Sequence, residues 1–539
     1  MAFLNCDFYF SKEERPLSDE EKVAARYVYK NAPNEDYNDL IKDDGRYFSK
    51  YNFSDYRQSI LRWYPFKKDS AALEINAECG ALTGALLDNC GSVFLTEPSL
   101  FKAQLVCGRY AGRDNLTVFA GDFHAVDFKR KFDYIVFFKT LERSENPVQT
   151  LNFLKGLLKP GGVLLLEAEN QYGIQNLLGK KDSHSGIPFD SFAGYPSADK
   201  GRGFSRAALQ KILESSAFAE WNFYYPLPDA FAPRAIYSDK APPKANMIER
   251  LVVAREDAST FVADERRLYV DAVENGVYHF LSNSFFVEAS DSANNLASIK
   301  SATLGGYRPR KKSFATIIRS DSLVQKKGLF AESAEYANDL CALANELSSR
   351  GVCVLPMRAD GNSLLMDFVS ADTVQMFFRK MVQEKDKETA LEILDSLWND
   401  ILKSSDLSNV SSLERFGIDA GPLLKRAYLE MASLNSFWIE GRIVFFDQEV
   451  VRNDYPALYV FWRSLAMLYG QIAELDALLP RRDINAKYKI TEKMEKLFES
   501  LEQKLEKDEN PYQVFYQDPL SEEKAAQNRM RLLGGAYGG

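Results

Sequence analysis

The chain has few of the residues that build metal centres and disulfide frameworks. Its 539 residues include only three histidines, which are His124, His184 and His279 and lie far apart in the sequence. Its six cysteines form no CxxC pair and have no metal-finger spacing. A histidine-rich metal site is therefore excluded as a first hypothesis, and we expect reduced thiols.

Long apolar runs and an excess of positive charge are also missing. No window approaches the roughly 18 uninterrupted apolar residues of a membrane span, and the first residues lack the basic and then apolar pattern of a secretory signal. The formal net charge of -9 argues against a broad surface for nucleic-acid phosphates. We expect a cytoplasmic protein without a membrane span or a nucleic-acid partner.

The residues that are present favour several folded domains. Hydrophobic residues make up 46% of the chain and charged residues 27%, which is typical of globular proteins, and 539 residues are too many for one core. The proline-containing stretch "SDKAPPKANM" marks the main expected boundary. We predict a helical segment over 1–59, an α/β domain over 60–240, an α+β domain over 248–475 and a helical tail over 476–539.

The region after residue 70 has the pattern of a parallel sheet covered on both faces. Short apolar runs alternate there with amphipathic stretches, and the runs are "AALEI", "SVFLTE", "LTVFAG", "FDYIVFF" and "GVLLLEAE". A turn pattern of acid and small residues follows the first run, where Glu74, Asn76, Glu78 and Gly80 alternate. The second run ends in an acid, Glu97.

This succession resembles the class I S-adenosylmethionine-dependent methyltransferases. Their turn after the first strand carries the pattern E/D-x-G-x-G-x-G, and "FAGDF", "FDYIVFFKTLE" and "LLKPGGVLLLEAEN" resemble later segments of the same fold. The resemblance implies a Rossmann-like domain that binds S-adenosylmethionine. It further implies that Glu74, Asn76 and Gly80 lie against the methionine part, that Glu97 binds the ribose hydroxyls, and that Asp122 contacts adenine.

Two glycines of that pattern are replaced in this chain. Asn76 tolerates the left-handed backbone better than most residues, but the carboxylate of Glu78 is expected to repel the carboxylate of the cofactor. Lys139, in the loop after the fourth run, is expected to neutralise Glu78 if the two loops meet. The candidates for a group acting on the acceptor are Glu169, Asn170, His184 and Tyr224, chosen by their loop positions.

The stretches "AENQYGIQNLLGKKDSHSGIPFDSFAGYP" and "FYYPLPDAFAPRAIYSD" suggest a narrower likeness. They resemble a bacterial group of methyltransferase-like proteins associated with cell-surface glycan synthesis, in which the first motif is closer to L-E-I-G-A-G-C-G-A-L-T-G. The resemblance implies a glycan or sugar-phosphate acceptor. Where the group tends to have Gly-Val, this chain has Lys139 and Thr140.

A second group of chemistry-bearing residues lies in "YLEMASLNSFWIEGRIVFFDQE", residues 428–449. Glu430, Asn435 and Asp447 have the spacing with which protein-kinase-like phosphotransferases place one carboxylate near the acceptor hydroxyl and two oxygen ligands on magnesium. The resemblance implies a catalytic role for Glu430, metal binding by Asn435 and Asp447, and ATP with Mg²⁺ as cofactors.

Upstream residues extend this kinase-like resemblance. Lys326 in "SLVQK" stands where a strand lysine reaches phosphates, with Glu335 or Glu332 as its partner from the next helix, and "LLMDFV" resembles the adenine hinge. Three features depart from the family. Glutamate replaces the catalytic aspartate, the HRD histidine and arginine are absent, and "LGGYRPR" is the best match to the glycine-rich loop.

The last helical region is charged on one side. Met494, Leu497, Leu501 and Leu505 recur every three or four residues, which predicts an amphipathic helix. Two interpretations stay open. The helix packs on its own domain, or it forms a short coiled coil that binds glycan-synthesis proteins.

The order of the two resemblances suggests two functions. A methyltransferase-like domain followed by a kinase-like domain resembles the bifunctional chain-terminating enzymes of bacterial O-antigen synthesis. The first hypothesis is therefore an S-adenosylmethionine-dependent methyltransferase acting on a glycan or its phosphorylated terminus. The alternative is a pseudoenzyme scaffold that binds partner proteins through two degenerate folds.

Overall fold

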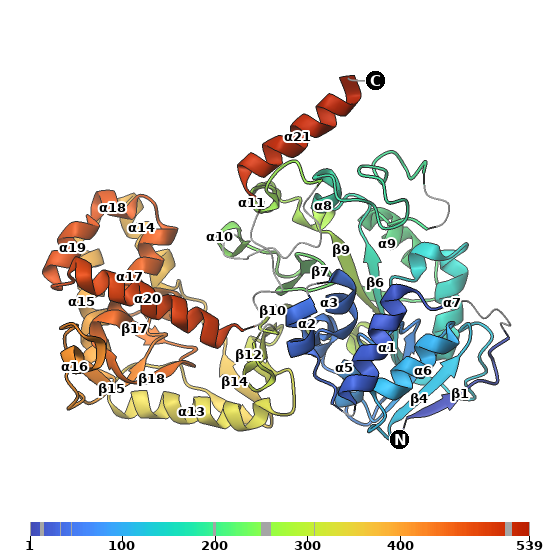
Figure 1. The fold of residues 1–539 in the computed structure, drawn as a ribbon, viewed down its shortest axis with the longest axis horizontal. Coiled ribbons are helices and arrows are strands. Elements are labelled where there is room, and N and C mark those ends of the chain that lie inside the picture. The colour runs from blue at the N-terminus through green and yellow to red at the C-terminus, as the bar shows by residue number, and fades with distance from the viewer. Residues whose placement is uncertain are drawn as a thin grey trace. The chain divides into compact units, whose positions relative to one another are not determined.

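A parallel sheet forms the centre of the N-terminal part of the computed structural model, which describes residues 2–10, 16–32, 34–44, 46–197, 201–248, 260–306, 308–511 and 520–537. The chain divides into two compact units, residues 1–321 with 512–539, and residues 322–511. Figure 1 labels the elements of both units.

The sheet of the first unit begins with parallel strands in the order β1-β4-β3-β2-β5-β6. Their bounds are β1 Phe3–Asn5, β2 Ala71–Ile75, β3 Ser92–Glu97, β4 Leu116–Ala120, β5 Phe132–Phe138 and β6 Leu158–Glu169. Strand β2 is buried along its whole length, as the apolar run "AALEI" predicts for a strand covered on both faces. The expected Rossmann-like parallel sheet is thus confirmed.

Antiparallel strands complete this sheet. Strand β9 (Ser284–Ser290) pairs with both β6 and β7 (Glu220–Leu227), and β8 (Ala235–Ser238), β10 (Ile299–Leu304) and β11 (Phe314–Arg319) follow. The division between the units differs from the expected boundary at 240–248. The reason is that β9, whose residues are all buried, belongs to the first sheet although it comes after that boundary.

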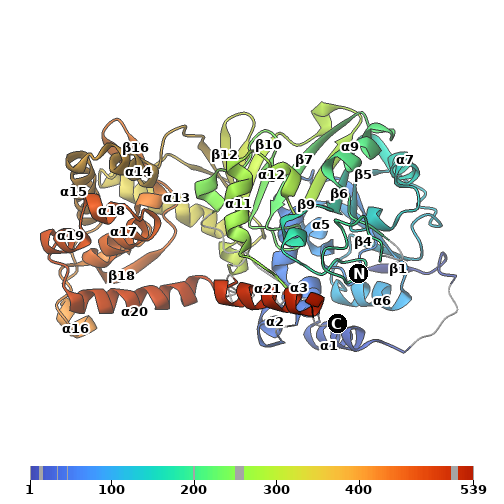
Figure 2. The same cartoon turned by 90° about the horizontal axis from the view of Figure 1, so that it is seen from above.

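Helices cover both faces of the parallel strands, as Figure 2 shows. They are α5 (Thr83–Asn89), α6 (Leu100–Arg109), α7 (Pro147–Leu157) and α9 (Arg206–Glu214). The N-terminal helices are α1 (Asp19–Asn31), α2 (Asn38–Asp44), α3 (Tyr47–Phe53), η1 (Asp55–Gln58) and α4 (Ser59–Arg62). A capping box formed by Ser18 and Glu21 begins α1, so the predicted cap at Ser18 is confirmed.

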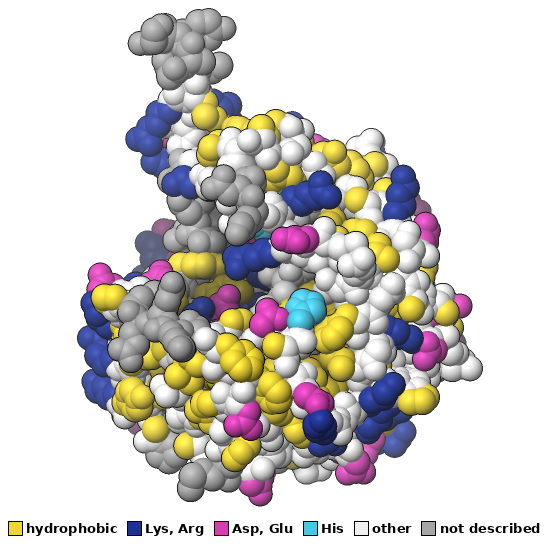
Figure 3. Space-filling model, turned by 90° about the vertical axis from the view of Figure 1, so that its right-hand side faces the viewer, with side chains coloured by type: hydrophobic (Ala, Val, Ile, Leu, Met, Phe, Trp, Pro, Cys, Tyr) yellow, Lys and Arg dark blue, Asp and Glu magenta, His cyan; other side chains and the backbone are white. Residues whose placement is uncertain are grey.

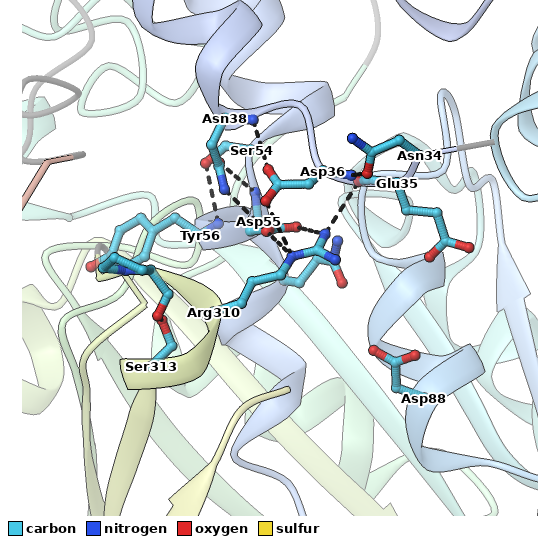
Figure 4. Close-up of polar contacts among 12 residues, drawn as sticks. Asn34, Glu35, Asp36, Asn38, Ser54, Asp55, Tyr56, Asp88, Arg310 and Ser313 are labelled. Atoms are coloured by element: carbon cyan, nitrogen blue, oxygen red, sulfur yellow. Dashed lines mark hydrogen bonds and ion pairs between the residues drawn. The ribbon is translucent and has the colours of Figure 1, made fainter. Parts of the chain in front are cut away.

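A partly buried charge network joins the N-terminal helices to the loop between β10 and β11 (Figure 4). Arg310 Nε and Nη2 donate to the two carboxylate oxygens of Asp55 at 2.6 and 2.9 Å, and Asn38 Nδ2 donates to Asp55 Oδ2 at 3.0 Å. A second carboxylate, that of Asp36, lies 3.6 Å from Arg310 Nε. Because Asp55 is almost fully buried, the two-point contact with Arg310 offsets the cost of desolvating its charge.

Shorter elements complete the first unit. They are η2 (Leu141–Arg143), α8 (Ile174–Leu177), α10 (Ala245–Ile248), α11 (Glu265–Glu274), α12 (Tyr278–Leu281), η3 (Ala293–Asn295), η4 (Arg310–Lys312) and α21 (Glu522–Tyr537).

The second unit combines short antiparallel strands with helices. Strands β12 (Leu323–Gly328), β14 (Ser363–Asp367) and β13 (Arg358–Asp360) pair in that order, and helix α13 (Ser333–Ser349) follows β12. Gly361, in the predicted hairpin about "ADGN", has a φ of +59°, which this tight turn requires. The predicted hairpin and the predicted helix ending near Gly351 are both confirmed.

The rest of this unit is mainly helical, with two small strand pairs. Strand β15 (Leu423–Tyr428) pairs with β18 (Val451–Pro456), and β16 (Ser436–Ile439) pairs with β17 (Arg442–Phe445). The helical elements are α14 (Val374–Glu384), α15 (Lys387–Lys403), α16 (Ser412–Phe416), η5 (Ser433–Asn435), α17 (Ala457–Gln471), α18 (Leu475–Leu478), α19 (Arg481–Lys487) and α20 (Glu492–Glu509).

Helix α20 packs on its own unit. Met494, Leu501 and Leu505 are buried in the core of the second unit, and Leu497 packs against that core. The own-domain interpretation of the amphipathic pattern is therefore confirmed. Within the described parts of the chain, no helix is both long enough and apolar enough to span a membrane.

Candidate cofactor-binding site

A cavity of about 680 Å³ opens at the carboxyl ends of β2 and β5. The strand order reverses between these two strands, and in open α/β sheets such a switch point is where ligands bind. The volume suits a nucleotide-sized ligand. Six residues singled out in the sequence line it, which are Glu74, Asn76, Glu78, Asp122, Lys139 and Thr140.

The turn after β2 keeps a glycine-type backbone although it has lost two glycines. Asn76 has a φ of +56°, Glu78 a φ of +50° and Gly80 a φ of +73°. L-residues pay about 1–2 kcal/mol in this left-handed region, so the conformation persists only because surrounding contacts hold it. At Gly80, an added Cβ would lie 3.0 Å from the ring of Tyr110, which adds a steric reason for glycine.

Polar contacts hold this turn in place. Glu97 Oε2 accepts the backbone N–H of Glu78 at 2.8 Å, and Asn76 Nδ2 donates to Thr140 Oγ1 at 3.4 Å. The carbonyl oxygen of the Asn76 side chain is buried without a hydrogen-bond partner. A buried acceptor without a partner is costly, which suits a site that a ligand donor completes.

Glu97, the predicted ribose ligand, is buried next to the cavity and does not line it. Its second oxygen accepts the backbone N–H of Ser99 at 3.0 Å. Burial raises the pKa of Glu97 to about 7. Both oxygens of Glu97 accept backbone N–H groups, so this carboxylate stabilises the turn. A ribose hydroxyl would have to donate to a remaining lone pair of these oxygens.

Glu74 closes the inner end of the cavity. It is almost fully buried and accepts a hydrogen bond of 2.6 Å from the hydroxyl of Thr83. Burial raises the pKa of Glu74 to about 7, which the Thr83 bond partly opposes.

The predicted adenine end has an aromatic wall. Asp122 Oδ1 accepts the backbone N–H of His124 at 2.8 Å, and the His124 ring lies 3.9 Å from the ring of Phe123 and 5.0 Å from that of Phe153. All four residues line the cavity. The Asp122 carboxylate can accept from an amino group, and the tilted rings beside it can pack against a base. On the face of the first unit drawn in Figure 3, a histidine is exposed beside acidic and hydrophobic side chains.

The expected pairing of Lys139 with Glu78 is wrong. Lys139 Nζ lies 3.7 Å from Glu169 Oε1 and 5.1 Å from the centre of the Tyr51 ring. The exposed Glu78 instead has Lys102 as its charge partner. Burial lowers the pKa of Lys102, but the charges of Glu78 and Glu97 outweigh it and raise that pKa. Lys139, like the turn residues, has a positive φ of 50°.

Three acids lie behind Lys139 at the ends of β5 and β6. Burial raises the pKa of both Glu142 and Glu167, and each has one buried carboxylate oxygen without a hydrogen-bond partner. Burial also favours the neutral form of Glu169, but the charges of Lys139 and of nearby Lys180 outweigh it and lower the pKa of Glu169. The group therefore holds its negative charge mainly on Glu169.

The other loop candidates have different surroundings. Asn170 Nδ2 donates to the backbone oxygens of Phe280 and Ser282, and the buried Tyr224 hydroxyl donates to Glu288 at 2.9 Å. Both are structural contacts away from the cavity lining. His184 lies 4.0 Å from Glu169 through Nε2, which has no hydrogen-bond partner. Of these candidates, His184 and Glu169 belong to the charged group behind Lys139.

The second unit brings several of its predicted residues together. Lys326 Nζ, on β12, contacts the carboxylates of Asp447 and Glu449. Glu430 Oε2 accepts the backbone N–H groups of Glu449 at 2.8 Å and of Val450 at 3.2 Å, so this carboxylate is already engaged. The roles predicted for these residues stay predictions.

Two other predicted residues lie in the same unit. The Asn435 backbone oxygen accepts the N–H of Phe446 at 2.9 Å, and Glu335 lies on the first turn of α13. The roles assigned to Asn435 and Glu335 also stay predictions.

Sequence analysis missed the N-terminal wall of the cavity. Arg57 and Tyr51 line it from η1 and α3, and Arg57 is almost fully buried. The only sign of this wall in the sequence is an arginine within the polar and aromatic stretch "YNFSDYRQS". The stretch has no glycine pattern and resembles a surface helix, so it does not indicate a binding site.

A known protein family matches part of the first unit. Residues 48–219 match a family model described as a methyltransferase domain. The chain therefore contains a methyltransferase domain over these residues. No curated protein matches the sequence.

Several solved structures are similar over part of the chain. The complex between the Haloferax volcanii Trm112 methyltransferase activator and a methyltransferase matches with 17% identity over 51% of this chain and 99% of that chain, at a TM-score of 0.30. An S-adenosylmethionine-dependent methyltransferase from Thermotoga maritima, described as a possible histamine N-methyltransferase, matches with 13% identity over 48% and 98%, at 0.30. The N-methyltransferase NodS from Bradyrhizobium japonicum, with S-adenosyl-L-homocysteine, matches with 17% identity over 38% and 89%, at 0.24.

Replacing Glu142 by glutamine should make the stability of the first unit less dependent on pH. The raised pKa means that the folded state binds this proton more tightly than the unfolded state. The stabilisation is therefore present at low pH and lost as pH rises through the raised pKa. We expect the free energy of unfolding of Glu142→Gln to be about 1–2 kcal/mol higher than that of the wild type at pH 8. The difference should be much smaller at pH 5, and thermal unfolding measures it.

The control for this prediction is Glu145→Gln, the same substitution at an exposed carboxylate of the same loop. It should change the melting temperature little at either pH. Equal effects of the two substitutions would contradict the role of burial at Glu142.

Replacing Glu78 by glycine should strengthen binding of S-adenosylmethionine several-fold. Glycine adopts the positive φ without strain, and the substitution removes a negative charge from the cavity rim. Isothermal titration calorimetry measures the change. Glu78→Gln separates the two causes because it removes the charge and keeps the strain; unchanged affinity in both variants would count against a working cofactor turn.

Proposed function

We propose that residues 48–219 bind S-adenosylmethionine in the 680 Å³ cavity and transfer its methyl group to an acceptor. The observation that carries the proposal is the backbone of the turn after β2, where Asn76, Glu78 and Gly80 all have positive φ. This conformation lets bare backbone approach the methionine part as glycines would. A turn that had lost this purpose would have no reason to keep two strained residues.

The residues present include groups suited to two parts of the cofactor. Asp122 and the rings of Phe123 and His124 would hold adenine, and the turn would hold the methionine part. When bound, the cofactor supplies an electrophilic methyl group on its sulfonium. The protein aligns donor and acceptor, since methyl transfer depends on a short, in-line approach.

We further propose that the acceptor is a glycan or its phosphorylated terminus. The support is the resemblance of residues 168–196 and 223–239 to proteins associated with cell-surface glycan synthesis. This narrower proposal depends on methyl transfer by the first unit.

Phosphoryl transfer by the second unit is a second candidate function. The observation that favours it is the contact of Lys326 with Asp447, because a strand lysine and a metal-binding aspartate both face the phosphates in kinase-like sites. ATP and Mg²⁺ would then be the ligands, with Asn435 and Asp447 on the metal and Glu430 near the acceptor.

A scaffold without catalysis remains the competing function for both units. The contacts of Glu430 support this scaffold function, since a carboxylate that accepts two backbone N–H groups is a poor base.

The first test is a calorimetric titration of the full chain with S-adenosylmethionine. We expect micromolar binding with one site per chain. The Asp122→Ala variant should bind at least about fivefold more weakly because it loses a hydrogen bond to adenine. Absence of binding at millimolar ligand would support the scaffold instead.

The second test concerns Asp447. If the second unit binds ATP through magnesium, Asp447→Ala should abolish magnesium-dependent ATP binding, because the metal loses a carboxylate ligand. The Asp454→Asn variant, which neutralises a half-buried carboxylate, tests for a general effect of charge in the same unit. Equal ATP affinity of wild type and Asp447→Ala would contradict the phosphotransferase assignment.

A further inference from the structure

Two basic side chains lie at the cavity wall without a carboxylate at hydrogen-bond distance. Arg57 Nη1 donates to the backbone oxygen of Ala230 at 2.8 Å, but Arg57 Nε is buried without a hydrogen-bond partner. The side chain of Lys139 is 34% exposed, and its nearest carboxylate oxygen, on Glu169, is 3.7 Å away. That distance is longer than a hydrogen bond.

Both cations gather around one aromatic ring. The centre of the Tyr51 ring lies 5.0 Å from Arg57 Cζ and 5.1 Å from Lys139 Nζ. Like charges held near each other in a cavity repel, and cation–π contacts compensate only part of that cost. An anion between the two donors would relieve the repulsion and satisfy the donors together.

The acids near the two cations favour their charged forms but do not pair with them at hydrogen-bond distance. Glu169 offsets one charge, while burial keeps Glu142 and Glu167 from offsetting the other fully near neutral pH. The further charged and phenolic groups close to these residues are Lys180, Asp229 and Tyr47. Neither Glu142, Glu167 nor Glu169 lines the cavity. Glu74 does line it, and burial raises the pKa of this carboxyl group although the charge of Arg57 opposes that shift.

We propose that Arg57 and Lys139 form an anion subsite that binds a carboxylate or phosphate group of a ligand in this cavity. The proposal rests on the proposed function, since the ligand occupies the same cavity. The anionic group has two possible sources, the amino-acid carboxylate of the cofactor or an acidic group of the acceptor. Lys139 stands beside Thr140, which contacts the cofactor turn through Asn76, so either source can reach it.

The test compares ligands that differ in this group. S-adenosylhomocysteine carries the amino-acid carboxylate, and methylthioadenosine keeps the adenosine and sulfur without it. Calorimetry of the full chain gives both affinities for the wild type and for Lys139→Met. In parallel, inorganic phosphate at constant ionic strength is titrated while the melting temperature is followed.

Two results support the subsite and identify its ligand. If it holds the cofactor, Lys139→Met weakens S-adenosylhomocysteine about tenfold and leaves methylthioadenosine unchanged. If it holds the acceptor, both nucleosides bind as before and the stabilisation by phosphate is lost. In either case Lys139→Arg should restore most of the lost effect, because it restores the charge.

Three results would overturn the subsite. They are equal weakening of both nucleosides, no change in any arm, or the same loss in Arg143→Gln, which removes an exposed charge from the same cavity wall. If the wild type binds neither nucleoside, the proposed function fails. The phosphate arm still decides whether the anion subsite exists.

Discussion

The left-handed backbone of the turn after β2 is the constraint on which the site depends. Two residues with side chains adopt a conformation that glycine adopts without strain, at a cost of about 1–2 kcal/mol each. The N–H of Glu78 is held by the buried Glu97, and the N–H of Ala77 by the backbone of Thr96 at 3.2 Å. The end of β3 therefore determines the shape of a turn that belongs to β2. Asn76 and Glu78 place side chains at the rim, while their backbone adopts the left-handed conformation that glycine favours.

Electrostatics around Lys139 divides the cavity into two parts. At one end, Asp122 and aromatic rings form a wall suited to a base. At the other end, Arg57 and Lys139 place positive charge beside Tyr51, and the negative charge behind them is held mainly by Glu169. Burial raises the pKa of the neighbouring acids Glu142 and Glu167. The net charge at this end of the cavity should therefore be more positive at low pH than at high pH.

Much of the first unit could be predicted from the sequence, because strand runs and turn patterns are local. The parallel strands and the turn residues lie where the patterns place them. The partner of Lys139 could not be predicted from the sequence. The partner depends on the direction of the Lys139 side chain, which the positive φ of this loop residue determines. Strand β9 was assigned to the wrong side of a boundary because a short apolar run does not say which sheet it joins. Arg57 was missed because its burial arises from helices packed over the cavity.

The most direct test of the account is a crystal structure of the chain with S-adenosylhomocysteine. The account predicts the ligand in the cavity between β2 and β5, with adenine near Asp122, its amino-acid part along residues 76–80, and positive φ retained at Asn76 and Glu78. An empty cavity at saturating ligand, with Glu78 folded into the space of the methionine part, would contradict it. The domain would then be a scaffold that keeps the shape of a methyltransferase without its cofactor.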